Sequence, residues 1–237
     1  TLVQVNVIIE SNICRLGGVL LKQEIFKGAG VAIITPYTED AQFEELGRII
    51  EDQIAGGTDA IIITGTTGES ATMTDDEHKS AIKYAVKGAG RIPVIAGTGS
   101  NETDYAVKLS VYAEQVGADA LLVVTPYYNK CTQKGLVKHF TTMQISKYSY
   151  YSVQCTIRTG VNIQVPTFVE LAKHPRIVAV KEASGDLSAV ARFAMLAVMS
   201  WLFIPAMMTR LCLFFSGGYG VISSIVQCAT SYWLTIS

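Results

Sequence analysis

The sequence predicts an α/β fold, a (β/α)8 TIM barrel. Short runs of β-branched and aliphatic residues alternate with segments of helical spacing, and the first six runs recur roughly every 25–33 residues. The runs are apolar throughout rather than alternating, which is typical of strands that are covered on both faces. A chain of 237 residues is long enough for one such barrel.

Eight strands and at least five helices are expected in alternation. The strands are predicted over 30–35, 59–64, 92–96, 118–125, 150–153, 177–181, 201–204 and 219–223. The helices are predicted over 43–55, 74–88, 102–116, 135–146 and 166–174, with another from Leu187. Thr74 and Glu77 have the spacing of a capping box, and Pro166 suits a first helical turn. No GxGxxG motif follows the first strand, which argues against a dinucleotide-binding sheet.

Composition excludes several classes of function. The formal net charge is −1 and the isoelectric point is near 6.3, which argues against a nucleic-acid partner. The five cysteines form no CxxC pair, as expected of reduced thiols in a cytoplasmic protein. The three histidines have no ligand spacing with one another or with cysteine. We therefore expect neither a metal nor another cofactor.

The two ends of the chain depart from the barrel pattern. Residues 1–24 form an N-terminal extension of unclear role that lacks the basic start and cleavage site of a secretory signal. Residues 25–237 are expected to form the barrel, with atypical segments at 143–157 and 191–237.

The C-terminal segment is poor in charge. The stretches 193–209 and 211–237 contain no charged residue, and Arg210 separates them. Their length would allow a membrane span, but Pro205 and a cluster of glycines around Gly217 argue against a membrane partner.

Lys181 ends the predicted strand 177–181. Burial at this place would disfavour the ammonium form and lower the pKa of the side chain from its usual value of about 10.4. The resulting free amine could attack a carbonyl group and form a Schiff base. The alternative is a lysine that has merely emerged into solvent after the strand.

Unusual polar residues gather where the predicted strands end. Such segments are Thr35-Pro36, 65–70, 97–99, 125–129, Lys181 and Ser223. The carboxyl ends of TIM-barrel strands share one rim, which holds the active site. Turns of glycine and threonine, and tyrosines that pack on a core, would explain each segment alone. Together they suggest a site that holds a carboxylate while its keto carbon meets the Lys181 amine.

At these residues the chain resembles the dihydrodipicolinate (4-hydroxy-tetrahydrodipicolinate) synthases of the pyruvate-dependent class I aldolase family. The matching stretches are 26–40, 65–78, 91–103, 117–130, 158–163 and 178–188. The resemblance implies a Schiff-base lyase of lysine (diaminopimelate) biosynthesis. In it, Lys181 forms an imine with pyruvate, and the derived enamine attacks aspartate semialdehyde.

The resemblance also implies roles for other residues. Thr66 would belong to a hydroxyl relay, and Thr67 would hold the pyruvate carboxylate. Tyr128 would complete the relay from a neighbouring subunit, which implies a homo-oligomer, a dimer or a tetramer. Arg158 would bind the carboxylate of the second substrate through its guanidinium fork. Ile222 would line the pyruvate pocket through its backbone.

The chain departs from the family pattern at three places. Val153 stands where the family has a tyrosine, and Tyr151 could replace it only if the strand carries a local shift or bulge. The family's Ser-Gly-Asp/Asn segment is missing near 204–206, and the chain lacks the C-terminal helical region that the family adds.

Two alternative functions stay open. A sister aldolase acting on a sugar keto acid, like the N-acetylneuraminate lyases, would share the lysine. Such enzymes usually lack the Arg158-Thr159-Gly160 sequence and the Thr66-Thr67 pair. The departures named above also allow a catalytically impaired barrel with a binding or assembly role.

Overall fold

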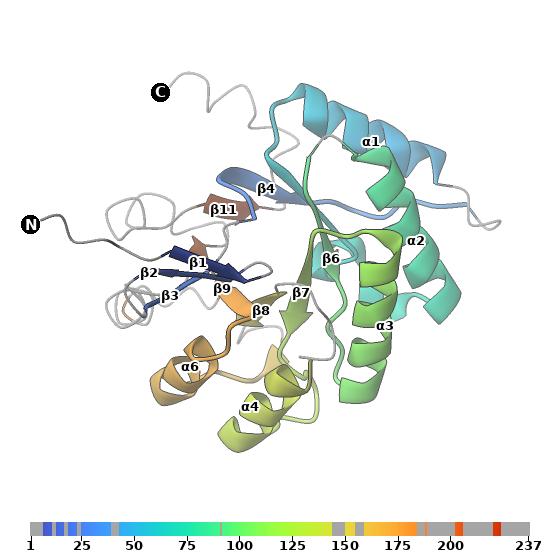
Figure 1. Ribbon diagram of the computed structural model, residues 1–237. Helices are drawn as coiled ribbons and strands as arrows, with labels where there is room; N and C mark the ends of the chain where they lie inside the picture. Colours follow the sequence, from blue (N-terminus) through green and yellow to red (C-terminus); the bar gives the residue numbers. More distant parts are fainter. Residues whose placement is uncertain are drawn as a thin grey trace, which may run out of the picture.

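The barrel and its outer helices account for most of the chain that can be described (Figure 1). The computed structural model describes residues 7–10, 13–16, 19–22, 25–38, 43–90, 92–143, 150–154, 159–183, 188, 202–205 and 220–223.

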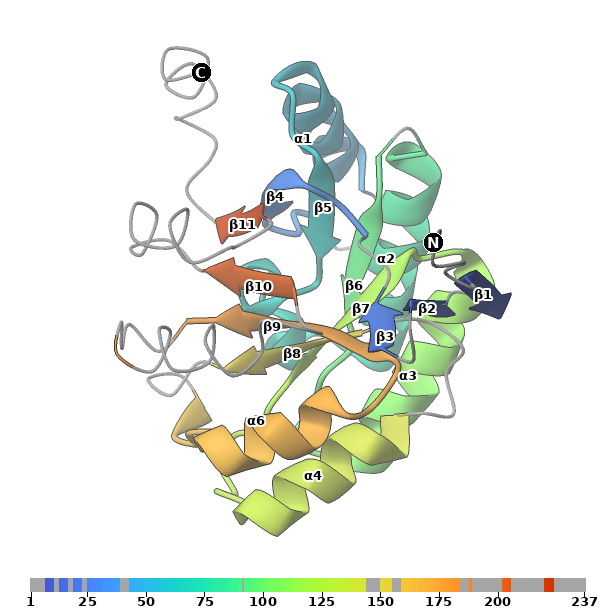
Figure 2. The same ribbon diagram turned by 60° about the vertical axis from the view of Figure 1, so that its left-hand side comes forward.

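A parallel sheet of eight strands forms the centre of the described part of the chain. The strands are β4 (Gly28–Ala32), β5 (Ala60–Ile63), β6 (Val94–Gly97), β7 (Ala120–Val124), β8 (Tyr150–Gln154), β9 (Ile177–Glu182), β10 (Leu202–Pro205) and β11 (Gly220–Ser223). Their order is β10-β9-β8-β7-β6-β5-β4-β11. The end strands β10 and β11 lie side by side, so the sheet curls into a barrel (Figure 2). The TIM-barrel prediction is confirmed.

Five helices lie outside the barrel within the described residues. They are α1 (Glu44–Ala55), α2 (Asp75–Gly88), α3 (Thr103–Val116), α4 (Gln133–Thr142) and α6 (Val165–Ala172). The predicted capping box of α2 is present, because Glu77 N–H donates to Thr74 Oγ1 and Thr74 N–H donates to the Glu77 carboxylate. Pro166 lies in the first turn of α6. The start of the helix predicted from Leu187 lies outside the described residues.

The first barrel strand differs from its prediction. It covers Gly28–Ala32 rather than 30–35, because its ladder with β11 pairs Gly28 through Val31 with Gly220 through Ser223. Beyond Ala32 the backbone leaves this ladder, although Ile33 N–H still donates to Ile62 O at 3.1 Å. Of the apolar residues after Ala32, Ile33 still packs in the core between strands and helices, whereas Ile34 is 48% exposed.

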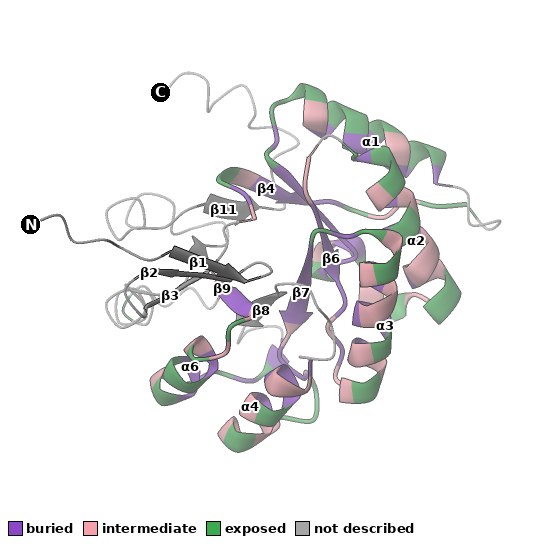
Figure 3. Cartoon of the chain, viewed as in Figure 1, coloured by how far each residue is buried: buried purple, intermediate pink, exposed green. Residues whose placement is uncertain are grey.

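Both faces of β5 and β6 are buried, as are Ile177 to Val180 of β9 (Figure 3). In β5, Ile61 and Ile63 pack with the helices, while Ala60 and Ile62 pack inside the barrel with Phe26. This alternation follows from the two-residue period of a strand. It explains why the strands read as continuous apolar runs in the sequence.

The N-terminal extension contains a separate antiparallel sheet of three strands. These are β1 (Val7–Glu10), β2 (Ile13–Leu16) and β3 (Val19–Lys22), in the order β1-β2-β3. The sequence analysis did not predict them, although Gly17-Gly18 between β2 and β3 is a typical hairpin sequence. The domain boundary after residue 24 stays a prediction.

The described helices are all too short or too polar to cross a membrane. The uncharged stretches 193–209 and 211–237 lie outside the described residues, apart from short strand segments.

Candidate active site

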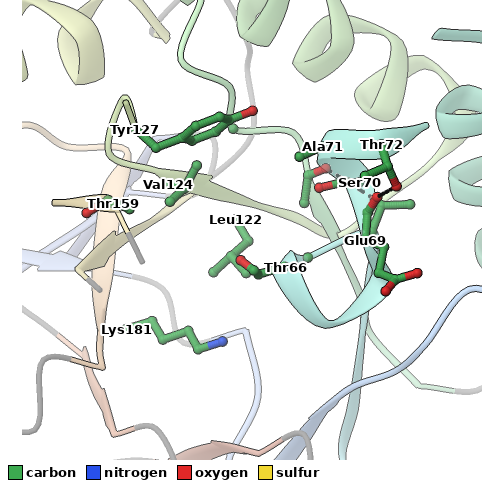
Figure 4. Close-up of a pocket in the computed structure, with 14 residues that line it drawn as sticks. Thr66, Glu69, Ser70, Ala71, Thr72, Leu122, Val124, Tyr127, Thr159 and Lys181 are labelled. Carbon is green, nitrogen blue, oxygen red and sulfur yellow. Dashed lines mark hydrogen bonds between the residues drawn. The ribbon is translucent and has the colours of Figure 1, made fainter. Parts of the chain in front are cut away.

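A cavity of about 290 Å³ lies at the carboxyl ends of the barrel strands (Figure 4). This is the rim where TIM-barrel enzymes hold their active sites. The cavity is lined by Thr64, Gly65, Thr66, Glu69, Ser70, Ala71, Thr72, Gly97, Gly99, Leu122, Val124, Tyr127, Thr159 and Lys181.

Lys181 is the only amine among the described residues that line the cavity. The residues before it in β9, Ile177 to Val180, are fully buried, whereas Lys181 itself is half-buried. Its side chain extends into the cavity, toward the side on which Thr66 lies (Figure 4). The strand thus carries its one basic side chain from the apolar core into the site.

Thr66 reaches the cavity from a tight turn after β5. The turn consists of two short 3-10 helices, η1 (Thr66–Gly68) and η2 (Ser70–Thr72), joined by Glu69 at a φ of 57°. Gly68 leaves room for the Thr35 side chain, because a Cβ there would lie 2.6 Å from Thr35 Oγ1. Thr67 is half-buried and is not among the lining residues. The structure therefore brings Thr66 and Lys181 together, while Thr67 contributes no side-chain surface to the cavity.

The end of β5 is held by contacts with the end of β6. Thr64 has a φ of 51°, and a Cβ at Gly97 would collide with the Thr64 carbonyl. Thr64 Oγ1 lies 2.8 Å from Ile63 O and 3.1 Å from Gly97 O. The strained conformation of Thr64 thus depends on the absence of a side chain at Gly97.

His78 of α2 hydrogen-bonds to the end of β6 from the helix side of the barrel. Its Nε2 lies 2.9 Å from Gly97 O, and this nitrogen is the donor because a carbonyl oxygen only accepts. Burial lowers the pKa of His78, and the Gly97 carbonyl and Asp75 only partly oppose this effect. The imidazole is therefore neutral at pH 7, with its proton on Nε2.

His139 of α4 occupies a similar place behind β7. Its Nδ1 lies 2.9 Å from Thr103 Oγ1, and the ring packs edge-on against Phe140. Burial lowers its pKa to about 4, which the Val124 carbonyl partly opposes. Two neutral, buried histidines therefore stand behind strand ends that line the cavity.

The two tyrosines after β7 point to different places. Tyr127 lines the cavity, whereas Tyr128 has a φ of 70° and is 87% exposed. Tyr128 is therefore outside the cavity of its own chain. Its predicted role in a neighbouring subunit stays a prediction.

For the predicted site residues Tyr151 and Ile222 the structure describes the backbone alone, and Arg158 lies outside the described residues. In β8, Val153 pairs with Lys181 and Tyr151 pairs with Ala179. A register shift does occur, but it falls between Tyr150 and Tyr151, so Tyr151 remains two residues before the level of Lys181. Ile222 pairs with Gly30 in the barrel wall. The roles of all three stay predictions.

The sequence analysis assigned no role to two further lining residues. Tyr127 was grouped with the polar rim but given no function. Thr159 is only 4% exposed, and its hydroxyl accepts from Val161 N–H at 3.3 Å. Its place in the Arg158-Thr159-Gly160 sequence was the signal that could have identified it.

Comparisons with known proteins agree with this geometry. The model of the dihydrodipicolinate synthetase family matches residues 25–234. A 4-hydroxy-tetrahydrodipicolinate synthase from Thermoanaerobacter sp. (strain X514) is 57% identical over 178 residues, which cover 72% of this chain and 59% of the relative.

Solved structures give the same result. The Acinetobacter baumannii dihydrodipicolinate synthase in complex with pyruvate is similar with a TM-score of 0.81 and 36% identity, covering 89% of this chain and 75% of that one. The Thermotoga maritima dihydrodipicolinate synthase has a TM-score of 0.82 and 33% identity, covering 90% and 77%. The sequence match spans about 59% of the length of the Thermoanaerobacter relative.

Proposed function

Because the chain belongs to the dihydrodipicolinate synthetase family, we propose that it condenses pyruvate with aspartate semialdehyde to give 4-hydroxy-tetrahydrodipicolinate. The observation that carries this proposal is the Lys181 amine, which enters the same cavity as the Thr66 turn. The names of the relatives favour this synthase over an aldolase for sugar keto acids.

The chemistry begins at the Lys181 nitrogen. The amine attacks the keto carbon of pyruvate and water leaves, which gives an imine. Loss of a methyl proton converts the imine to an enamine, whose terminal carbon attacks the aldehyde carbon of aspartate semialdehyde. The amino group of the adduct then attacks the imine carbon, closes the ring and releases Lys181.

The Thr66–Gly68 turn offers a place for the pyruvate carboxylate. The first N–H groups of a helical turn have no partner within the turn, and they favour anions. Those of Thr66 and Thr67 would receive the carboxylate, so Thr67, which is not among the lining residues, would act through its backbone N–H. Ile222 would complete this pocket from β11.

Proton transfer and binding of the second substrate involve the remaining predicted residues. Thr66, Tyr128 and Tyr151 would form the hydroxyl relay. Tyr151 would take the role of the family tyrosine whose position is occupied here by Val153. Arg158 would hold the carboxylate of aspartate semialdehyde, since its guanidinium can bind a carboxylate through two hydrogen bonds.

We also propose a homo-oligomer in the cytoplasm. The outward position of Tyr128 supports a role in the site of a neighbouring copy, because the residue makes no part of the cavity of its own chain. In this arrangement residues 1–24 form an extension and residues 25–237 the barrel.

The test is reduction with borohydride in the presence of pyruvate, followed by peptide mass mapping. We expect a reduced pyruvyl adduct on Lys181 and none on Lys173, an exposed lysine directly after α6 that pairs with Glu170. Absence of an adduct on the folded protein, or equal labelling of both lysines, would refute the imine. Consumption of pyruvate that depends on aspartate semialdehyde then tests the acceptor.

A further inference from the structure

Gln133, the first residue of α4, uses its side-chain amide to hold a neighbouring segment. Its Nε2 donates to Asn162 O at 2.8 Å. Its Oε1 accepts from Gln164 N–H at 3.0 Å and from Thr167 Oγ1 at 2.7 Å. The three bonds all go to the segment that leads from the end of β8 into α6, which lies beside α4 (Figure 2).

The start of α4 does not need these bonds. Its N-cap is Thr132, whose hydroxyl accepts from Gly135 N–H at 3.2 Å. Gln133 follows the cap and directs its amide away from its own helix. The side chain of Gln133 therefore tethers the start of α4 to the start of α6 and to Asn162 just before it, more than 28 residues away in sequence.

The segment 159–164, here called the Thr159 wall, borders the cavity at Thr159 alone, and Gln133 holds its far end at Asn162 and Gln164. It begins with the lining residue Thr159, whose hydroxyl closes a turn with Val161, and it continues through the buried side chains of Val161 and Ile163. The Lys130 side chain lies near Gly160, which has a φ of 69°, because a Cβ built at this glycine would be 3.4 Å from Lys130 Cε. The wall therefore rests on the 130–133 loop, and Gln133 is its hydrogen-bonded anchor.

Thr159 and the Lys181 amine face different parts of the cavity. In Figure 4, Thr159 lies on the side of Val124 and Tyr127, whereas the Lys181 amine extends toward the side of Thr66. If pyruvate occupies the Lys181 side, as proposed above, the aldehyde must approach from the remaining space. The Thr159 wall then bounds the acceptor.

We infer that Gln133 is a positioning residue for the second substrate, because it fixes the Thr159 wall against which the acceptor aldehyde binds. This inference rests on the proposed function. It requires that loss of the tether weakens use of aspartate semialdehyde while Lys181 still forms its imine with pyruvate.

The test is Gln133→Met, which keeps the length of the side chain and removes all three hydrogen bonds. We expect the KM for aspartate semialdehyde to rise on the order of tenfold, because small displacements of a substrate-positioning wall have large kinetic effects. The KM for pyruvate and the yield of the Lys181 adduct should stay within about twofold. Amide hydrogen exchange over 159–164 should become faster.

Two further variants separate positioning from general stability. Thr132→Ala removes the cap of the same helix but leaves the tether, so it should lower thermal stability without the selective rise in KM. Gln133→Glu keeps the two accepted bonds and loses only the donor to Asn162 O. Its KM should therefore lie between those of the wild type and Gln133→Met.

Two results would overturn the inference. One is an unchanged KM for the aldehyde in Gln133→Met, and the other is an equal change in both KM values that Thr132→Ala reproduces. A wild-type protein without a Lys181 adduct would instead refute the proposed function. The exchange measurement would still decide whether Gln133 holds the wall.

Discussion

The two rims of the barrel differ in which residues adopt positive φ angles. At the amino-terminal rim, positive φ angles fall on Gly28, Gly57 and Gly117, which adopt them at little cost. At the carboxyl-terminal rim, the positive φ angles of non-glycine residues fall on Thr64, Glu69, Tyr128 and Lys130. Such angles cost of order 1–3 kcal/mol each and gather at functional sites.

Hydrogen bonding differs in the same direction. At the amino-terminal rim, Asp59 and Asp119 each exchange two bonds with a neighbouring strand: the Asp59 carboxylate accepts from Ala29 N–H at 2.7 Å, and Asp59 N–H donates to Ala29 O at 2.9 Å. Asp119 and Val94 repeat this arrangement. At the opposite rim, the buried hydroxyls of Thr35 and Thr125 have no partner among the described residues. The amino-terminal rim therefore has satisfied hydrogen bonds between its strands, whereas the carboxyl-terminal rim contains strained residues and unpaired buried hydroxyls.

The largest effect should follow removal of the Lys181 amine. Lys181→Met should lower the rate of condensation by on the order of 10³-fold or more, because no other described lining residue can form the imine. Thermal stability should change little by comparison. Steady-state kinetics and a thermal melt of the same preparation measure both quantities, and a variant that keeps a tenth of the activity would refute the role of Lys181.

The second prediction concerns the strained end of β5. Gly97→Ala should lower the free energy of unfolding by roughly 1–3 kcal/mol and also lower activity, because the new Cβ meets the Thr64 carbonyl. Gly90→Ala is the matched control, since its nearest atom, Lys87 O, would be 4.0 Å away. Urea unfolding and kinetics test the pair. Equal behaviour of the two variants would mean that Gly97 is not required by Thr64.

The fold was predictable where its signals are local. Eight apolar runs gave the eight strands, and the Thr74-Glu77 capping box gave the start of α2. Lys181 could be placed at the site because it ends an apolar run on a known rim. The end of the first strand was predicted too late, since the apolar run continues past the last ladder residue, Ala32, into the buried Ile33 and the exposed Ile34.

The site was less predictable because its contacts join distant parts of the chain. The sequence around Thr64 gives no sign of a positive φ, which depends on Gly97 in the next strand. Gln133 reads as an ordinary first-turn residue until its partners, about 30 residues later, are brought beside it. Thr67 was predicted from a motif, and the motif does not show that its side chain stays outside the cavity lining. The exposure of Tyr128 is compatible with its predicted role in a neighbouring subunit, which stays a prediction.

The third prediction concerns the two buried histidines behind the carboxyl-terminal rim. Burial lowers the pKa of His78 and of His139, the latter to about 4. As the pH falls, the two histidines are therefore protonated in the unfolded chain before they are protonated in the folded one. Stability from these groups is therefore present above their usual pKa near 6.5 and is lost as pH falls toward the folded values. His139 should contribute a slope of up to about 1.4 kcal/mol per pH unit between pH 6.5 and 5, and His78 should contribute a slope of the same sign below pH 6.5.

A conservative variant sharpens this test. His78→Gln keeps an amide donor for Gly97 O but does not titrate, so urea unfolding between pH 7 and 5 should show a shallower loss of stability. An identical slope in the variant and the wild type would show that His78 is not the group that takes up the proton.

The smallest expected effect belongs to the amino-terminal rim. Asp59→Asn keeps an oxygen near Ala29 N–H but removes its charge, so it should cost about 1 kcal/mol of unfolding free energy and leave kinetics unchanged. Asp119→Asn should do the same at Val94. The two effects should add, because the carboxylates share no partner. A fall in activity greater than the fall in stability would contradict the division between the rims, since strain at the cavity would then depend on bonds at the opposite end of the barrel.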